Sequence, residues 1–143
     1  MNLVDANVLL YAVNEADPKH GTARRWLDRQ LSGQGTVGFA WIVVLAFLTL
    51  STRAGLFPRP LGVTDSIGMV RSWLASPSAI VVHETSRHLD VLADLLEATG
   101  VGGNLATDAH LAALAIEHHA NVVTFDSDFG RFPGLRSAPP DLA

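Results

Sequence analysis

Two short apolar runs, each followed by an aspartate, constrain the fold of this chain most strongly. Residues 1–4 lead into Asp5, and residues 122–125 lead into Asp126. Short apolar strands separated by helical stretches are typical of a parallel sheet that helices cover on both faces. The carboxyl ends of neighbouring parallel strands meet at one edge, where ligands bind in open α/β sheets. We therefore expect Asp5 and Asp126 to lie close together at that edge.

The rest of the chain supplies the other strands and helices of such a sheet. Apolar periodicity predicts further strands over residues 36–39 and 79–82, and the apolar run before Asp126 is the last strand, over residues 121–125. Helices are expected over about residues 6–12, 19–32, 41–51, 65–75, 86–99 and 106–118. Thr64 is the expected N-cap of the fourth helix, and Thr85 or Ser86 that of the fifth. The tail beyond Pro133 is expected to be loose.

Composition narrows the class of protein. A chain of 143 residues with 48% hydrophobic and 17% charged residues is one globular domain, residues 1–143. The absence of cysteine excludes a disulfide scaffold, a zinc ribbon and a thiol nucleophile. The most apolar run, residues 39–50, is too short to span a bilayer, and the start does not resemble a signal peptide. We therefore expect no membrane partner and a cytoplasmic location.

Charge leaves the partner open. The net charge of −4 argues against a protein that grips nucleic acid by bulk electrostatics, unless bound metal neutralises several aspartates. Nine of the ten basic residues are arginine, which suits bidentate phosphate contacts, but they form no basic run.

Four aspartates are candidates for one metal site. Asp108 opens an alanine-rich helix, and Asp128 follows Asp126 by two residues. Carboxylates gathered in one crevice repel one another unless a cation lies between them, and Mg²⁺ or Mn²⁺ prefers oxygen ligands. This interpretation predicts a metal-dependent hydrolase that acts on phosphodiesters. Taken singly, however, each aspartate is also explained as a helix N-cap or a turn residue.

The same segments resemble the PIN-domain family, and within it the VapC-type ribonuclease toxins. The resemblance is carried by LVDANVLLYA near the start, SWLASPSAIVVHETSRHLDVLADLL in the middle and GNLATDAHLAALAIEHHANVVTFDSDFGRFPGL near the end. It extends over nearly the whole chain. The combination of D-A-N, T-D-A-H-L-A-A-L-A and F-D-x-D-F is far more specific than D-x-N alone.

The resemblance implies a fold, an activity and a set of site residues. The fold is a three-layer α/β/α sandwich with a central, mainly parallel sheet. The activity is Mg²⁺- or Mn²⁺-dependent endoribonuclease cleavage by the toxin of a toxin–antitoxin pair, with RNA as substrate and a cognate antitoxin as partner. Asp5, Asp108 and Asp126 match the metal-binding aspartates, Asp128 matches the auxiliary catalytic one, and Asn7 matches the asparagine after the first aspartate.

One departure from the family pattern concerns the second helix of such domains, which usually carries a glutamate. Ala46 stands at the corresponding position, and no carboxylate occurs between Asp28 and Asp65. Two consequences remain open: a site that binds one ion well and a second poorly, or a carboxylate recruited from elsewhere. An alternative function follows, a catalytically degenerate PIN-like module that binds RNA or a protein without cleaving. A dehalogenase-type phosphatase is disfavoured because its second aspartate would replace Asn7.

The mechanistic hypothesis assigns roles to these residues. Asp5, Asp108 and Asp126 hold the principal cation, and Asp126 or Asp128 orients or deprotonates the attacking water. The candidate residues for donating hydrogen bonds to the metal-binding carboxylates are Thr124, Ser127 and Asn104.

Other conspicuous side chains receive structural interpretations. His110, His118 and His119 lack zinc-site spacing and are expected at the surface or at helix ends. The three tryptophans (Trp26, Trp41 and Trp73) lie on apolar helical stripes and are expected in the core. The arginines at positions 24, 25, 29 and 53 are expected on solvated faces. Residues 41–50 carry more apolar side chains than one core requires, which predicts a protein interface. The family resemblance implies two partners for it, the antitoxin and a second copy of the chain, so we expect a homodimer.

Overall fold

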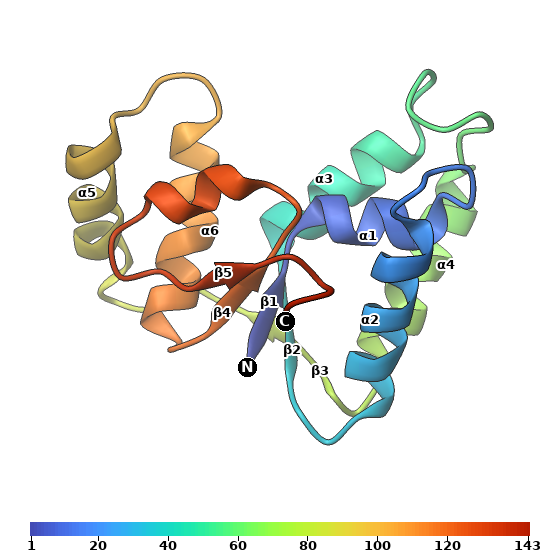
Figure 1. Ribbon diagram of the computed structural model, residues 1–143, viewed down its shortest axis with the longest axis horizontal. Coiled ribbons are helices and arrows are strands. Elements are labelled where there is room, and N and C mark those ends of the chain that lie inside the picture. The colour runs from blue at the N-terminus through green and yellow to red at the C-terminus, as the bar shows by residue number, and fades with distance from the viewer.

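The computed structural model describes residues 1–143 and places a five-stranded sheet at the centre of the molecule (Figure 1). Its strands are β1 (Asn2–Val4), β2 (Val37–Ala40), β3 (Ala79–Val82), β4 (Asn121–Val123) and β5 (Ser137–Ala138). All neighbouring pairs are parallel, in the order β3-β2-β1-β4-β5. The central strand β1 therefore lies beside β4, as expected if Asp5 and Asp126 meet at one edge of the sheet.

Helices cover both faces of this sheet. They are α1 (Ala6–Val13), α2 (His20–Ser32), α3 (Trp41–Ser51), α4 (Val63–Leu74), α5 (His88–Thr99) and α6 (Leu105–Glu117), with a short 3₁₀ helix η1 (Ser127–Arg131). Figure 1 shows α5 and α6 on one side of the sheet and α1 to α4 on the other. This is the predicted α/β/α sandwich, and none of its helices is long and apolar enough to cross a membrane.

The core explains why the central strands are so short and so apolar. Leu3 and Val4 of β1 and Val122 and Val123 of β4 have no exposed surface, because both faces of the sheet are covered. In β2, a Cβ atom on Gly38 would lie 2.6 Å from a methyl carbon of Leu3. A larger residue at that position would force the side chains of Leu3 and Val82 to shift.

Two of the three tryptophans are in the core as predicted. Trp26 of α2 is buried, and Trp73 of α4 packs against Phe47 of α3 with ring centroids 4.9 Å apart. The prediction for Trp41 was wrong, because this residue begins α3 and is 51% exposed.

Several predicted element ends were also wrong. The N-cap of α4 is Gly62, and Thr64 lies inside the helix. The N-cap of α5 is Arg87, and Thr85 instead binds a buried glutamate in α6. The structure also has a strand that the sequence did not predict, β5, which adds to β4 although its two residues have no apolar pattern. For α5 the difference arises because the Thr85 hydroxyl donates to Glu117, and helix ends in general vary by one or two residues.

Candidate acidic active site

The four candidate aspartates lie at ends of elements around the carboxyl edge of the sheet. Asp5 joins β1 to α1, and Asp126 lies just beyond β4 at the start of η1. Asp108 is in the first turn of α6, and Asp128 is in η1. Because β1 and β4 pair in register, their carboxyl ends meet, and the backbone N–H of Asp5 donates to the carbonyl of Val123 at 3.0 Å.

Hydrogen bonds fix the carboxylate of Asp5 in place. Its Oδ1 accepts from the backbone N–H of Ala6 at 2.7 Å. Its Oδ2 accepts from Thr124 Oγ1 at 2.7 Å and from Asn7 Nδ2 at 3.2 Å. The other end of the Asn7 amide accepts from the backbone N–H of Phe125 at 3.1 Å. Asn7 and Thr124 therefore tie the ends of β1 and β4 together around Asp5.

Asp126 and Asp128 have different surroundings. Asp126 Oδ1 accepts from the backbone N–H of Asp128 at 2.9 Å, which leaves Oδ2 free. The side chain of Asp128 is 63% exposed and forms an ion pair with Arg131 at 3.2 Å. The capping role proposed as the alternative thus also holds for Asp5 and Asp126, because each accepts a hydrogen bond from a residue of the following helix.

The electrostatics show that the carboxylates share one region. The pKa of Asp108 is raised to about 6 by burial and then by the charges of Asp5, Asp126 and Asp128, with Arg131 acting in the opposite direction. The pKa of Asp5 is raised as well, chiefly by burial and further by Asp126, against the hydrogen bonds from Thr124 and Ala6. Each acid that raises the Asp108 pKa is one of the four candidates.

The donor set suits a hard divalent cation. Carboxylate oxygens are the ligands that Mg²⁺ and Mn²⁺ prefer, and a cation would relieve the repulsion that raises the pKa of Asp108. As the side chains stand, no three acidic or histidine groups have the spacing of a closed metal site. The oxygens of Asp5 accept hydrogen bonds from Ala6, Asn7 and Thr124, and a carboxylate has further lone pairs with which it could bind an ion.

The other predicted donors differ in their relation to the site. Thr124 contacts Asp5 directly, and its Oγ1 also accepts from the backbone N–H of Asp126 at 3.0 Å. Ser127 lines a cavity of about 310 Å³ together with Asp126. The Asn104 side chain makes no capping hydrogen bond, and its backbone carbonyl accepts from Asp108 in α6.

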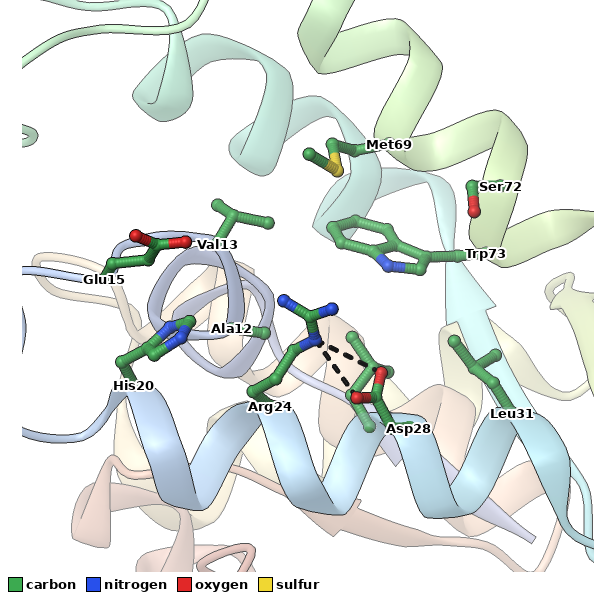
Figure 2. Close-up of a pocket in the computed structure, with 11 residues that line it drawn as sticks. Ala12, Val13, Glu15, His20, Arg24, Asp28, Leu31, Met69, Ser72 and Trp73 are labelled. Atoms are coloured by element: carbon green, nitrogen blue, oxygen red, sulfur yellow. Dashed lines mark hydrogen bonds and ion pairs between the residues drawn. The ribbon is translucent and has the colours of Figure 1, made fainter.

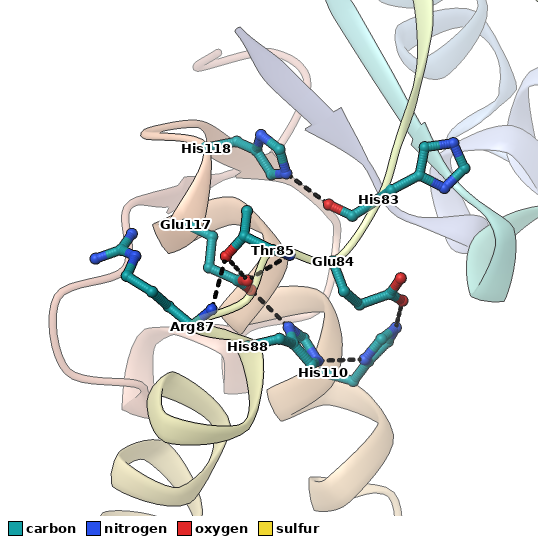
Figure 3. Close-up of polar contacts among 8 residues, drawn as sticks. All are labelled: His83, Glu84, Thr85, Arg87, His88, His110, Glu117 and His118. Atoms are coloured by element: carbon teal, nitrogen blue, oxygen red, sulfur yellow. Dashed lines mark hydrogen bonds and ion pairs between the residues drawn. The ribbon is translucent and has the colours of Figure 1, made fainter.

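Sequence reasoning missed a second polar network, which Figure 3 shows between α5, α6 and the loop after β3. The buried Glu117 side chain accepts from Thr85 N at 3.0 Å and from Thr85 Oγ1 at 2.6 Å, and lies 2.5 Å from His88 Nδ1. His88 Nε2 lies 2.9 Å from His110 Nδ1, and the His110 side chain, expected at the surface or at a helix end, is 24% exposed. Only the fold brings positions 85, 88, 110 and 117 together, and no spacing in the sequence reveals the network.

A further hollow lies away from the carboxylates. Figure 2 shows a groove of about 260 Å³ between α1, α2 and α4, with Trp73 and Met69 on one wall and the Arg24–Asp28 ion pair on the other. None of the four candidate aspartates lines it.

Comparison with known proteins places the chain in a family. The model of the PIN domain matches residues 3–135. Ribonuclease VapC37 of Mycobacterium tuberculosis is 57% identical over 143 residues, which is 99% of each chain. Ribonuclease VapC31 of the same species is 37% identical over 142 residues, covering 99% of this chain and all of the relative.

Solved structures agree with the fold. The sarcin-ricin loop cleaving toxin VapC20 of M. tuberculosis superposes with a TM-score of 0.66 at 22% identity, over 95% of this chain and 99% of that one. A VapBC2 structure from Rickettsia felis, bound to a promoter DNA fragment, gives a TM-score of 0.69 at 19% identity, over 96% of this chain and 97% of that one. The resemblance carried by the sequence motifs is thus confirmed: this chain belongs to the PIN-domain family, among the VapC ribonucleases.

Proposed function

We propose that this chain is the toxin of a toxin–antitoxin pair, an endoribonuclease that hydrolyses phosphodiester bonds in RNA with the help of Mg²⁺ or Mn²⁺. The observation that carries the proposal is that Asp5 and Asp126 follow the paired strands β1 and β4 at one edge of the sheet, with Asp108 at the start of α6 and Asp128 in η1. It is supported by relatives that match 99% of this chain and are named ribonucleases.

The proposed site residues have two roles: some would bind the cation, and one would orient the attacking water. When bound, the divalent cation supplies Lewis-acid polarisation of a phosphoryl oxygen. Asp5, Asp108 and Asp126 would hold it, with Thr124 fixing the orientation of Asp5. The free Oδ2 of Asp126 is the proposed acceptor that orients the attacking water. Asp128, which is paired with Arg131, is the alternative acceptor.

Two protein partners belong to the proposal. Antitoxins accompany toxins of this fold in solved complexes, including one from Klebsiella pneumoniae, and a cognate antitoxin is the proposed partner here. The second partner is another copy of the chain. Trp41 and Leu45 of α3 are 51% and 58% exposed, and large apolar side chains of this kind are costly to leave in water.

The test is cleavage of total RNA by the purified chain, freed of antitoxin, in Mg²⁺, in Mn²⁺ and in chelator. We expect discrete metal-dependent fragments from the wild type and none from Asp5→Asn or Asp126→Asn. Asp90→Asn, an exposed aspartate of α5, is the matched control and should cleave normally.

The competing function is a degenerate PIN-like module, because Ala46 stands where such domains usually carry a glutamate. Such a module would bind RNA without producing fragments in any metal. Cleavage that persists unchanged in both Asp5→Asn and Asp126→Asn would instead show that the assigned site is wrong. Calorimetric titration with Mn²⁺ separates loss of the metal from loss of a later step.

A further inference from the structure

The only lysine of the chain, Lys19, stands over an aromatic pair. Its Nζ lies 5.2 Å from the ring centroid of Tyr11 and 5.7 Å from that of Phe125. The two rings meet edge to face, with centroids 5.3 Å apart. Lys19 is exposed, and its ammonium forms no ion pair with any carboxylate.

This aromatic pair is attached to the acidic site through the backbone and through Asn7. Phe125 directly precedes Asp126, and its N–H donates to Asn7 Oδ1 at 3.1 Å. Tyr11 follows Asn7 by four residues in α1, so the two side chains lie on the same helix face. On the other side, His20 Nδ1 lies 2.9 Å from the carbonyl of Tyr11, which holds the start of α2 beside α1.

The position over the rings leaves the ammonium available for a ligand. A cation over an aromatic face is attracted by the ring without using its N–H donors, and an ammonium has three of them. Arg131, in contrast, is paired with Asp128 and lowers the pKa of Asp108. Lys19 has no such partner, so no carboxylate occupies its ammonium.

A cation that stands over Phe125, the residue before Asp126, and that pairs with no carboxylate suits a polyanion that approaches the acidic edge. RNA brings one phosphate per nucleotide to such a site, and each neutralised phosphate strengthens binding through counterion release. Net charge −4 makes a local cation more important for this chain than for a basic nuclease.

We propose that Lys19 binds an RNA phosphate that flanks the scissile one, and that Tyr11 and Phe125 are positioning residues that hold its ammonium there. The inference rests on the proposed ribonuclease function. It assigns to this side of the acidic edge the strand of RNA that runs past α1 and the start of α2.

The experiment measures binding of a short fluorescent single-stranded RNA of mixed sequence, in chelator, across a series of KCl concentrations. Lys19→Gln should weaken binding about fivefold at ~0.1 M salt and reduce the slope of log Kd against log salt by about 0.7, the value for one phosphate contact of a single strand. Lys19→Arg keeps the positive charge and should show the wild-type affinity and the wild-type salt slope. Arg71→Gln, which removes one exposed positive charge from α4, should change neither.

The aromatic pair is tested in the same assay. Tyr11→Leu keeps the charge of Lys19 but removes one ring, so binding should weaken by about two- to threefold, whereas Tyr11→Phe should match the wild type. An unchanged slope in Lys19→Gln, or an equal loss in Arg71→Gln, would overturn the proposal.

Cleavage of total RNA in Mg²⁺ by the same proteins separates this inference from the proposed function. If the wild type does not cleave, the ribonuclease proposal fails whatever Lys19 does. If the wild type cleaves, we expect Lys19→Gln to raise KM and leave kcat near the wild-type value, because the contact is made away from the reacting atoms.

Discussion

At the scale of single residues, the pKa of Asp108 reflects how closely the carboxylates of the acidic site lie together. Its carboxyl is only partly buried, yet its pKa is raised to about 6 because burial and three neighbouring carboxylates disfavour the charged form. A metal ligand must be deprotonated, so protons and cation compete for this group.

The first prediction concerns the pH dependence of metal binding. Mn²⁺ affinity should increase as pH rises through about 6, and below that pH it should fall by up to about tenfold per pH unit. Calorimetric titrations between pH 5 and 8 measure this dependence. Affinity that is flat over the range would show that Asp108 does not ligate the ion.

The same shift predicts the stability of the metal-free protein. Because the folded pKa lies above the ordinary value of 3.8, the penalty is absent at low pH and develops as pH rises from about 4 to above 6. Asp108→Asn should therefore stabilise the metal-free protein at pH 7.5 by about 1 kcal/mol, after allowing for solvent screening at this partly exposed group. Urea denaturation in chelator measures it, and the gain should vanish near pH 4.

At the scale of elements, Glu117 joins α6 to the loop after β3 and to the start of α5. Burial raises its pKa, but the hydrogen bonds from Thr85 and His88 outweigh that effect, so the net pKa lies below the ordinary 4.5. A depressed carboxylate pKa means that the stabilisation is complete above pH about 4.5 and is lost as pH falls through the folded value.

The prediction at this scale is that Glu117→Ala destabilises the fold by about 3 kcal/mol, since it leaves the partly buried donors of Thr85 and His88 unpaired. Urea denaturation at pH 7 measures the loss. Glu97→Ala, an exposed glutamate of α5, should stay within about 0.5 kcal/mol of the wild type. Equal effects of the two substitutions would contradict this role for Glu117.

A second element-scale prediction concerns the packing of β2 against its neighbours. A Cβ on Gly38 would approach Leu3 to 2.6 Å and Val82 to 2.7 Å. Gly38→Ala should cost about 1–3 kcal/mol by overpacking the sheet. Gly35→Ala, where the added Cβ meets nothing within 4 Å, is the matched control for the same denaturation experiment.

At the scale of the whole molecule, the exposed apolar surface of α3 predicts self-association. Sedimentation of the purified chain without antitoxin at micromolar concentration should give the mass of a dimer. Leu45→Asp places a charge on the proposed interface and should yield monomers. Leu89→Asp, at a 74% exposed leucine of α5, should leave the dimer intact. A monomeric wild type would contradict the interface.

The sequence by itself determined the sheet, most of its helices and the carboxylates that meet at its edge. Short apolar runs such as residues 3–4 and 122–123 are typical of strands buried on both faces, and parallel strands bring their carboxyl ends together. The motifs around Asp5, Asp108 and Asp126 were sufficient to predict the family, which the comparisons confirmed.

Only the tertiary structure decided which polar groups contact one another across long separations in the chain. Thr124 and Asn7 join at Asp5, and His110 reaches Glu117 through His88, because strand pairing and helix packing bring them into contact. The same packing exposed Trp41 and recruited β5 from a tail without an apolar pattern. Side-chain periodicity records which face of an element is buried, but not which distant residue lies against it.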